Sequence, residues 1–236
     1  WYVASDFSGH ATDSVRTSDA GNMTFYAKWF KKETPKQDDN GCFEISSAAE
    51  LYGFAAIVNA EDGIKTPQRK ACGKLTKDIV VNKNVLNEDG TLNDETKFDH
   101  TPWNPIDTFG GTFDGQGHTI SGLFYDDTTY YGPRIGLFGN IVVRDDGDTV
   151  VIRNIGLEKS YFRAMSAVGG IAGQVSSIAK SGLTIIENCY NASTFFAKNS
   201  TAGGIVAVVY SEPQVVIANC CNVGRVAANS YTGGIL

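Results

Sequence analysis

The sequence predicts an all-β protein, a right-handed parallel β-helix (solenoid) with one capping helix at its N-terminal end. Three observations predict this fold. A motif recurs with a period of 30 to 34 residues, each repeat holds short strand-like runs separated by Gly, Asn and Ser, and glycine is abundant, with 26 among 236 residues. Only one segment, near residue 50, has the apolar spacing of an amphipathic helix.

The repeat has two landmarks, a glycine followed by Leu or Ile and an asparagine two residues after an Ile. The glycines are Gly136, Gly170, Gly204 and Gly234, and the asparagines are Asn154, Asn188 and Asn219. Successive glycines are separated by 170 − 136 = 34, 204 − 170 = 34 and 234 − 204 = 30 residues. Two landmarks that share one period indicate a solenoid, a propeller or an array.

A parallel β-helix fits this repeat best. Runs such as residues 149–157, "TVVIRNIGL", are rich in β-branched residues, which excludes the helical solenoids. A propeller blade needs four strands in about 40 to 45 residues, whereas this repeat is shorter and loses residues at its last step. We therefore expect about five coils, with equivalent residues stacked about 4.8 Å apart and right-handed crossovers. The glycines then suit tight corners or close backbone approach, and the asparagines suit a stacked turn in which amides bond between coils.

The predicted helix covers residues 47–59 and caps one end of the coils. Ser47 and Glu50 have the Ser-x-x-Glu spacing of a capping box. The apolar residues that follow recur at helical spacing and predict one apolar face; they are Leu51, Phe54, Ala55 and Val58. Such a face must be buried, and the strands that follow offer the surface.

The chain before the helix is expected to fall into two parts. Residues 31–41, "KKETPKQDDNG", are polar or charged apart from one Pro and one Gly, which predicts a linker. Residues 23–29 have the period-two pattern of a strand. The initial Trp-Tyr together with "NMTFYAKW" resembles the last third of the Listeria-Bacteroides repeat, or internalin B-type repeat. The resemblance covers residues 1–30 and implies the C-terminal part of a β-grasp-like module that occurs in tandem on bacterial surface proteins.

Residues 42–236 resemble GLUG repeats, which occur in large surface and secreted bacterial proteins. Residues 136–139, "GLFG", match the Gly-Leu-x-Gly core, residues 170–173, "GIAG", have Ile for Leu, and the third copy has Ala207 in place of the final Gly. Residues 109–124, "FGGTFDGQGHTISGLF", resemble the strand pair that commonly precedes such repeats. In some IgA-specific metallopeptidases these units lie outside the catalytic domain. The resemblance therefore implies an extracellular location more than a chemistry, and we expect a β-helix truncated at its C-terminus, with further domains of the same polypeptide at both ends.

Composition limits the partners that this chain can bind. Lys and Arg number 20 against 26 Asp and Glu, so the formal net charge is 20 − 26 = −6. This balance argues against nucleic acids and anionic membranes as partners. No apolar run approaches the roughly 20 residues that a transmembrane helix needs, so no membrane insertion is expected within this chain. Glycans or surface proteins are the partners expected.

The five cysteines allow two bridges. Cys42 and Cys72 are 72 − 42 = 30 residues apart, and a disulfide between them would contribute about 3 to 4 kcal/mol in the chain-entropy model. Cys189 and Cys220 share one phase of the repeat, so in adjacent coils their Cα atoms would lie within disulfide range. Five reduced and buried cysteines are the alternative that the sequence leaves open.

No catalytic, metal or cofactor site is expected. A zinc protease requires His-Glu-x-x-His, and the three histidines, His10, His100 and His118, stand far apart. Residues 87–93 alternate oxygen-bearing side chains but lack the Glu that a calcium loop carries at its twelfth position.

Four carboxylates are the remaining candidates for chemistry. The acidic run that contains Asp145, Asp146 and Asp148 could gather calcium ligands, but an Asp-Gly cluster is more typical of a solvated turn. Asp114 precedes two spaced glycines, which is also mainly a turn signal.

The sequence therefore favours a non-catalytic extracellular module with an adhesive or spacing role at the bacterial cell surface. Two alternatives stay open. One is a carbohydrate-active β-helix enzyme, a polysaccharide lyase or hydrolase, with those four aspartates as candidate acids. The other is an accessory domain of a secreted protease whose catalytic motif lies elsewhere.

Overall fold

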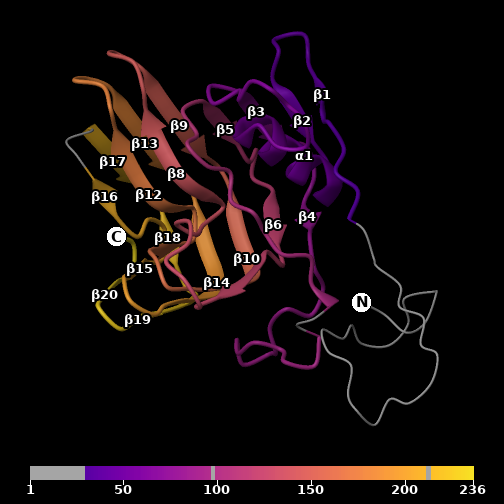
Figure 1. Cartoon of the computed structure of the whole chain (residues 1–236), viewed down its shortest axis with the longest axis vertical. Helices are drawn as coiled ribbons and strands as arrows, with labels where there is room; N and C mark the ends of the chain where they lie inside the picture. The colour runs from indigo at the N-terminus through magenta and orange to yellow at the C-terminus, as the bar shows by residue number, and fades with distance from the viewer. Residues whose placement is uncertain (1–29, 97–98, 211–213) are drawn as a thin grey trace.

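The computed structural model describes residues 30–96, 99–210 and 214–236. All of the predicted B-type repeat except its last residue, Phe30, lies outside these ranges, and so does the predicted strand over residues 23–29. The predicted parallel β-solenoid is confirmed: the strands of successive coils form four stacks, two of which extend over most of the molecule from the N-terminal helix to the C-terminal coil (Figure 1). Each complete coil of the C-terminal half contributes strands to all four stacks.

Two stacks extend over most of the length. The first sheet contains β1 (Lys36–Gln37), β2 (Phe43–Ile45), β3 (Cys72–Leu75), β5 (Thr112–Asp114), β9 (Thr149–Arg153), β13 (Leu183–Glu187) and β17 (Gln214–Ala218), in that order. The second contains β4 (Ile79–Val80), β6 (Thr119–Ser121), β7 (Phe124–Asp127), β10 (Gly156–Ala164), β14 (Tyr190–Ala197), β18 (Cys221–Asn222) and β19 (Arg225–Ala228).

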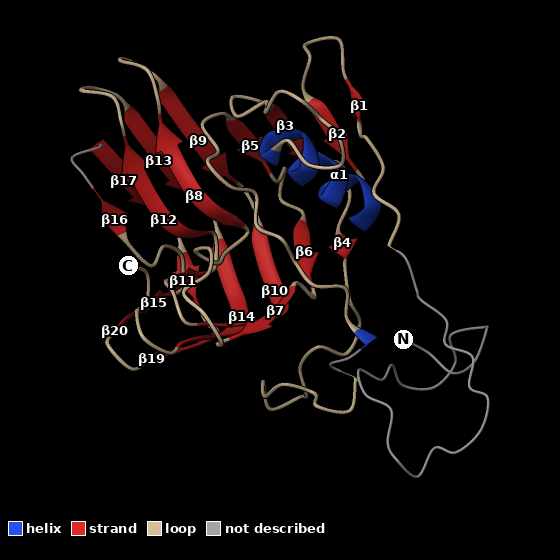
Figure 2. Ribbon diagram, in the orientation of Figure 1, coloured by secondary structure: helices blue, strands red, loops and turns tan. Residues whose placement is uncertain are grey.

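Two shorter stacks complete the later coils. The third sheet contains β11 (Val168–Gly169), β15 (Thr201–Gly203) and β20 (Tyr231–Gly233), and the fourth contains β8 (Phe138–Val143), β12 (Ala172–Ser177) and β16 (Val209–Tyr210). Among the strands described, neighbours from successive coils pair in parallel, and the antiparallel pair is β1 with β2 at the N-terminal edge. Figure 2 shows the strands of successive coils lying side by side, with the helix at one end of the row.

The interior consists of apolar side chains stacked in register. Ile152 pairs with Ile186 in the next coil, and both side chains are fully buried. Phe162 stacks on Phe195 with ring centroids 5.0 Å apart and an interplanar angle of 11°. Each large apolar side chain buried in this way stabilises the fold by roughly 1.5 to 3 kcal/mol. Because these contacts join equivalent positions of successive coils, the period of the sequence is the length of one coil.

The repeated asparagines form a ladder at the corner between the first and second sheets. Asn154, Asn188 and Asn219 have left-handed φ values of 56°, 53° and 53°. The Asn188 amide donates to Asn154 Oδ1 at 3.0 Å, and the Asn219 amide donates to Asn188 Oδ1 at 3.2 Å. Asn tolerates this backbone conformation better than most residues, and the ladder satisfies its amides.

The repeated glycines lie at the corner between the third and fourth sheets. A Cβ atom at Gly170 would lie 2.5 Å from the carbonyl oxygen of Gly204, and one at Gly204 would lie 2.0 Å from that of Gly234. Gly136 is similarly close to the backbone of the following coil, whereas Gly234 has open space around it. Close approach between coils therefore requires glycine at the first three positions, with no left-handed backbone involved.

Helix α1 (Ala48–Asn59) has Ser47 as its N-cap, within one residue of the predicted start. The Ser47 hydroxyl accepts from the Glu50 amide at 3.2 Å, but the Glu50 carboxylate accepts from the amide of Ser46, at 2.7 Å, and from its hydroxyl. The helix also differs from the prediction of one apolar face, because every residue from Leu51 to Val58 is buried. Phe54 packs against Phe113 of the interior, and other segments cover the opposite side of the helix.

One covering segment is residues 31–41, for which the sequence predicts a linker. In the structure β1 lies in this segment and pairs with β2, and the Glu33 amide donates to the Ala49 carbonyl at 3.0 Å. The contact with the helix is close, since a Cβ atom at Gly53 would lie 1.9 Å from the Glu33 carbonyl oxygen. Backbone hydrogen bonds hold a polar segment in place without any apolar residue, which the composition did not reveal.

Candidate functional site

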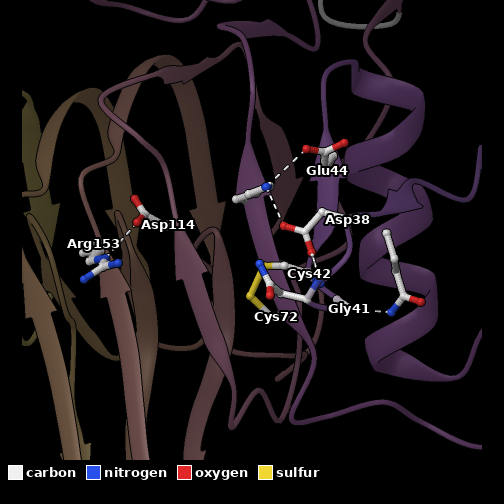
Figure 3. The surroundings of a disulfide bond; sticks show 10 residues. Asp38, Gly41, Cys42, Glu44, Cys72, Asp114 and Arg153 are labelled. Carbon is white, nitrogen blue, oxygen red and sulfur yellow. Dashed lines mark hydrogen bonds and ion pairs between the residues drawn. A yellow bond between two sulfur atoms is a disulfide. The ribbon is translucent and has the colours of Figure 1, made fainter.

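A disulfide bond joins the first two coils. Cys42 and Cys72 have their Cα atoms 4.6 Å apart and immediately precede the register pair formed by Phe43 and Gly73 (Figure 3). The bond is therefore a rung between adjacent coils. The loop that it closes spans 30 residues and contains α1, and closing it contributes about 3 to 4 kcal/mol in the chain-entropy model.

An ion-pair cluster fixes the β1–β2 hairpin beside the disulfide. Lys74 Nζ lies 2.6 Å from an Asp38 carboxylate oxygen and 3.2 Å from Glu44 (Figure 3). Asp38 also accepts from the backbone amides of Cys42 and Asn40, both at 2.9 Å. The hydrogen bond from Lys74, with these amide bonds, holds the pKa of Asp38 below its usual value. Asp38 thus stays ionised and keeps the hairpin turn closed.

A pocket of about 630 Å³ opens between this hairpin and the segment that leads into β3. Its cationic side chains come from that segment and from the residue after β8. The lining residues are Gln37, Asn40, Gly41, Phe43, Pro67, Gln68, Arg69, Lys70, Ala71, Cys72 and Arg144. Three of them are cations and none is a carboxylate, although acidic residues outnumber basic ones in the whole chain. We refer to this feature, centred on Arg69, Lys70 and Arg144, as the cationic pocket.

Arg144 has an unsatisfied donor. Its Nε atom is buried and has no hydrogen-bond acceptor within the described ranges. In the same part of the chain neither Arg69 nor Arg144 takes part in an ion pair. A buried donor without a partner costs about 1 to 3 kcal/mol.

Lys70 connects the pocket to the acidic run. Its Nζ lies 2.6 Å from Asp145 and 2.7 Å from Asp148. Its hydrogen bonds with these carboxylates raise the pKa of Lys70, and the same contact lowers the pKa of Asp148. Asp148 therefore lacks the raised pKa of a general acid. Asp146 accepts instead from the backbone amides of Lys180 and Ser181, at 2.7 and 3.2 Å, and joins two loops of successive coils.

Asp114 is held by structural partners in another part of the first sheet. It accepts from Arg153 Nε at 2.8 Å, from the Asn154 amide at 3.0 Å and from the Gln116 backbone amide at 2.8 Å. Partial desolvation raises the pKa of Asp114, but these three hydrogen bonds outweigh it and the net shift is downward. Asp114 is thus an ionised acceptor at the end of β5.

The four candidate acids do not converge. Asp148 precedes the first residue of β9, whereas Asp114 lies opposite Arg153, its last residue. A strand of this length spans about 16 Å, and the two carboxyl groups of a glycoside hydrolase lie about 5 to 9.5 Å apart. Asp145 and Asp148 do lie together, but both are bound to Lys70.

The oxygen atoms of the segment over residues 87–93 make structural hydrogen bonds. Asp89 Oδ1 accepts from the Thr91 amide at 2.9 Å, which closes a local turn. The backbone carbonyl oxygens of Asp89 and Gly90 accept from Arg225 at 2.9 Å and from Thr194 at 2.7 Å. The segment therefore lies along the outer face of β14 and β19. Among all residues with described positions, no group of three or more His, Cys, Asp or Glu side chains is placed to hold a metal ion.

Sequence reasoning did not identify the cationic pocket. Lys70 and Asp145 are 75 residues apart, and no local motif brings Arg69 near Arg144. The one local signal was a basic residue, Arg144, at the start of the acidic run.

None of the helices in the described ranges combines the length and the apolar character that crossing a membrane requires.

Comparison with known proteins shows neither a family nor an activity for this chain. No family model matches the chain, and no curated protein matches it. A solved structure from Bacteroides ovatus, provisionally described as an immunoglobulin A1 protease, aligns with 85% of this chain and 86% of its own, at 15% identity and a TM-score of 0.27. A likeness at this identity and TM-score carries no argument about activity.

Proposed function

We propose that this chain is a non-catalytic binding module of a bacterial surface or secreted protein, and that its cationic pocket binds an acidic glycan. One observation carries the proposal: Arg69, Lys70 and Arg144 line a single pocket that contains no carboxylate. The disulfide between Cys42 and Cys72 supports an extracellular location, because such bonds persist in oxidising compartments.

The pocket offers the chemistry that an acidic sugar requires. A guanidinium group binds a carboxylate or a sulfate through two parallel hydrogen bonds, and Arg69 and Arg144 have no competing ion pair in the described part of the chain. The side-chain amides of Gln37, Asn40 and Gln68 supply donors and acceptors for hydroxyl groups. The disulfide and the Asp38–Lys74 ion pair hold the rim in one conformation, which reduces the entropy lost on binding.

The carbohydrate-active alternative receives less support. Asp114 lies about one strand length from the other acidic candidates, and the acids whose pKa values shift are shifted downward by their partners. A binding role requires only the pocket. An accessory role in a secreted protease would be compatible with the same binding function.

Binding to polymers of defined charge tests the proposal. Polygalacturonate and a sulfated polysaccharide should bind the chain, and a neutral glucan should not. Exchanging both guanidinium groups, Arg69→Gln with Arg144→Gln, should weaken binding at least tenfold, since each charged hydrogen bond contributes about 1.5 to 3 kcal/mol. Lys77→Gln is the matched control, because Lys77 is exposed and lies outside the pocket lining.

Two results would contradict the proposal. The first is equal binding by the wild type and by the double arginine variant, which would place the ligand elsewhere. The second is release of soluble sugar from any of the polymers, which would favour the enzymatic alternative. Affinity should also fall as salt concentration rises, because the attraction to the arginines is electrostatic.

A further inference from the structure

Cys189 and Cys220 occupy equivalent positions in adjacent coils. On one side of them Glu187 pairs with Ala218, and on the other Tyr190 pairs with Cys221. The register therefore places Cys189 directly opposite Cys220. Neighbouring strands lie about 4.8 Å apart, which is within the range of Cα separations that a disulfide bridges.

The first disulfide has the same relation to its coils. Cys42 and Cys72 are also opposed residues of adjacent coils, next to a register pair in the first sheet. Their Cα atoms lie 4.6 Å apart and their sulfur atoms are bonded. This solenoid can thus accommodate a disulfide as a rung between coils without a break in strand pairing.

The two remaining thiols of equivalent phase are already in contact. Cys189 and Cys220 are joined by a side-chain hydrogen bond, and both sulfur atoms also contact backbone carbonyl groups of their own turns. That hydrogen bond lowers the pKa of Cys220 to about 7 and, together with burial, raises the pKa of Cys189. Cys189 is buried, whereas Cys220 is partly exposed. One thiol is thus poised as an accessible thiolate and the other as its buried neighbour.

We propose that Cys189 and Cys220 are a redox-active pair that an oxidised low-molecular-weight thiol, such as glutathione disulfide, converts into a second disulfide between coils. The Cys220 thiolate attacks one sulfur of the glutathione disulfide, forms a mixed disulfide and releases one glutathione thiolate. The Cys189 thiol loses its proton to solvent and attacks the Cys220 sulfur, which releases the second glutathione. Two protein thiols are oxidised by two electrons, and one glutathione disulfide is reduced to two thiols.

Oxidation of the Cys189–Cys220 pair would link the coil of β14 covalently to the coil that contains β18 and β19. In the reduced state that junction rests on short strand pairings, such as Tyr190 with Cys221, and on the bond between the amides of Asn191 and Asn222. Cys221 is exposed and lies opposite Tyr190, so it is not aligned with Cys189. The bridge would close a loop similar in length to that of Cys42 and Cys72, which predicts a measurable rise in thermal stability.

Peptide mapping tests the proposal. The full chain is incubated with glutathione disulfide at pH 8, alkylated, digested without reductant and measured by mass spectrometry. The expected product is a peptide pair linked through Cys189 and Cys220, two hydrogens lighter than the free peptides, beside the pair linked through Cys42 and Cys72. A link between Cys189 and Cys221, glutathione retained on Cys220, or alkylation of both Cys189 and Cys220 would each overturn it.

Thermal unfolding of matched variants gives a second measurement. After the same oxidation, Cys221→Ser should unfold about 5 °C or more above Cys220→Ser. Both variants keep Cys42 and Cys72, and the same comparison in the reduced state gives the difference that the two substitutions cause without a second bridge. Equal melting temperatures would show that no stabilising bridge forms. The map of the wild-type chain remains decisive if either variant folds poorly.

Discussion

Arg153 Nε donates a hydrogen bond to Asp114 Oδ2 at 2.8 Å across the boundary between two coils (Figure 3). The two residues are directly opposed on β9 and β5, and they belong to a row of alternating charge along the first sheet. The row consists of Glu44, Lys74, Asp114, Arg153 and Glu187. Opposed charges of opposite sign stabilise strand pairing by roughly 0.2 to 1 kcal/mol per pair. Lys74, Asp114 and Arg153, the three middle members of the row, therefore face opposite charges on both sides.

Replacement of Asp114 is expected to affect stability and leave ligand binding intact. Asp114→Ala removes the partner of Arg153 and the acceptor for Asn154, and should lower the free energy of unfolding by about 2 to 3 kcal/mol. Exchanging the charges, Asp114→Lys with Arg153→Glu, should not restore stability, because Lys74 and Glu187 would then face like charges. Urea unfolding gives the stability, and binding to polygalacturonate gives the function. Loss of binding at unchanged stability would indicate that Asp114 belongs to a functional site instead.

The buried His100 makes stability depend on pH below its ordinary pKa of about 6.5. Desolvation lowers the pKa of His100, against a smaller opposite effect of Asp99, and its ring packs edge-on against Phe124 at 5.0 Å. His100 binds a proton less readily in the folded protein than in the unfolded chain, where it is protonated below its ordinary pKa of about 6.5. The free energy of unfolding should therefore fall as the pH drops through that value. The carboxylates with lowered pKa values add their loss of stability only below about pH 4.

Unfolding of His100→Asn at several pH values checks this expectation. The variant should lose part of the decline between pH 7 and pH 5 that the wild type shows. Its stability relative to the wild type should therefore improve as the pH falls. Parallel pH profiles for the two proteins would show that His100 is not the group responsible.

The glycines at one corner should differ sharply in their tolerance of alanine. Gly204→Ala places a Cβ atom 2.0 Å from the Gly234 carbonyl oxygen, whereas Gly234→Ala meets no atom within 4 Å. We expect the first change to lower the free energy of unfolding by at least about 3 kcal/mol and the second by less than about 1 kcal/mol. Thermal or urea unfolding of the two variants measures the difference. Equal effects would mean that the coils can separate at this corner at little cost.

The fold could be predicted because every coil of a solenoid repeats the same structural positions, so equivalent residues recur in the sequence at one period. Ile152 and Ile186 recur because they stack, and Asn154 and Asn188 recur because each coil repeats the same left-handed turn. The buried helix was harder to predict, since its outer side is covered by a polar segment whose backbone holds it. Gly53 was the available sign, because a glycine inside a helix often marks close approach of another chain segment.

The cationic pocket could not be predicted for a related reason. Arg69 and Arg144 belong to loops of different coils, and loops do not follow the period of the strands. Their proximity depends on the stacking of β3, β5 and β9, which has to be known before any residue in one loop can be assigned a neighbour in another. The candidate acids Asp114 and Asp148, in contrast to the pocket, could be identified from the sequence. Their ion-pair partners, Arg153 and Lys70, could not.

The disulfide should support both stability and binding, because Cys72 lines the cationic pocket and Cys42 stands in the chain between two lining residues, Gly41 and Phe43. Cys42→Ser with Cys72→Ser removes the covalent rung and should lower the free energy of unfolding by about 3 to 4 kcal/mol. The Lys74–Asp38 ion pair still holds the hairpin, so we expect the affinity for polygalacturonate to fall several-fold without disappearing. Reduction of the wild type should reproduce the effect, and Cys221→Ser, far from the pocket lining, should not. Unchanged affinity, measured at a temperature where the double variant is folded, would show that the pocket does not depend on the rung beside it.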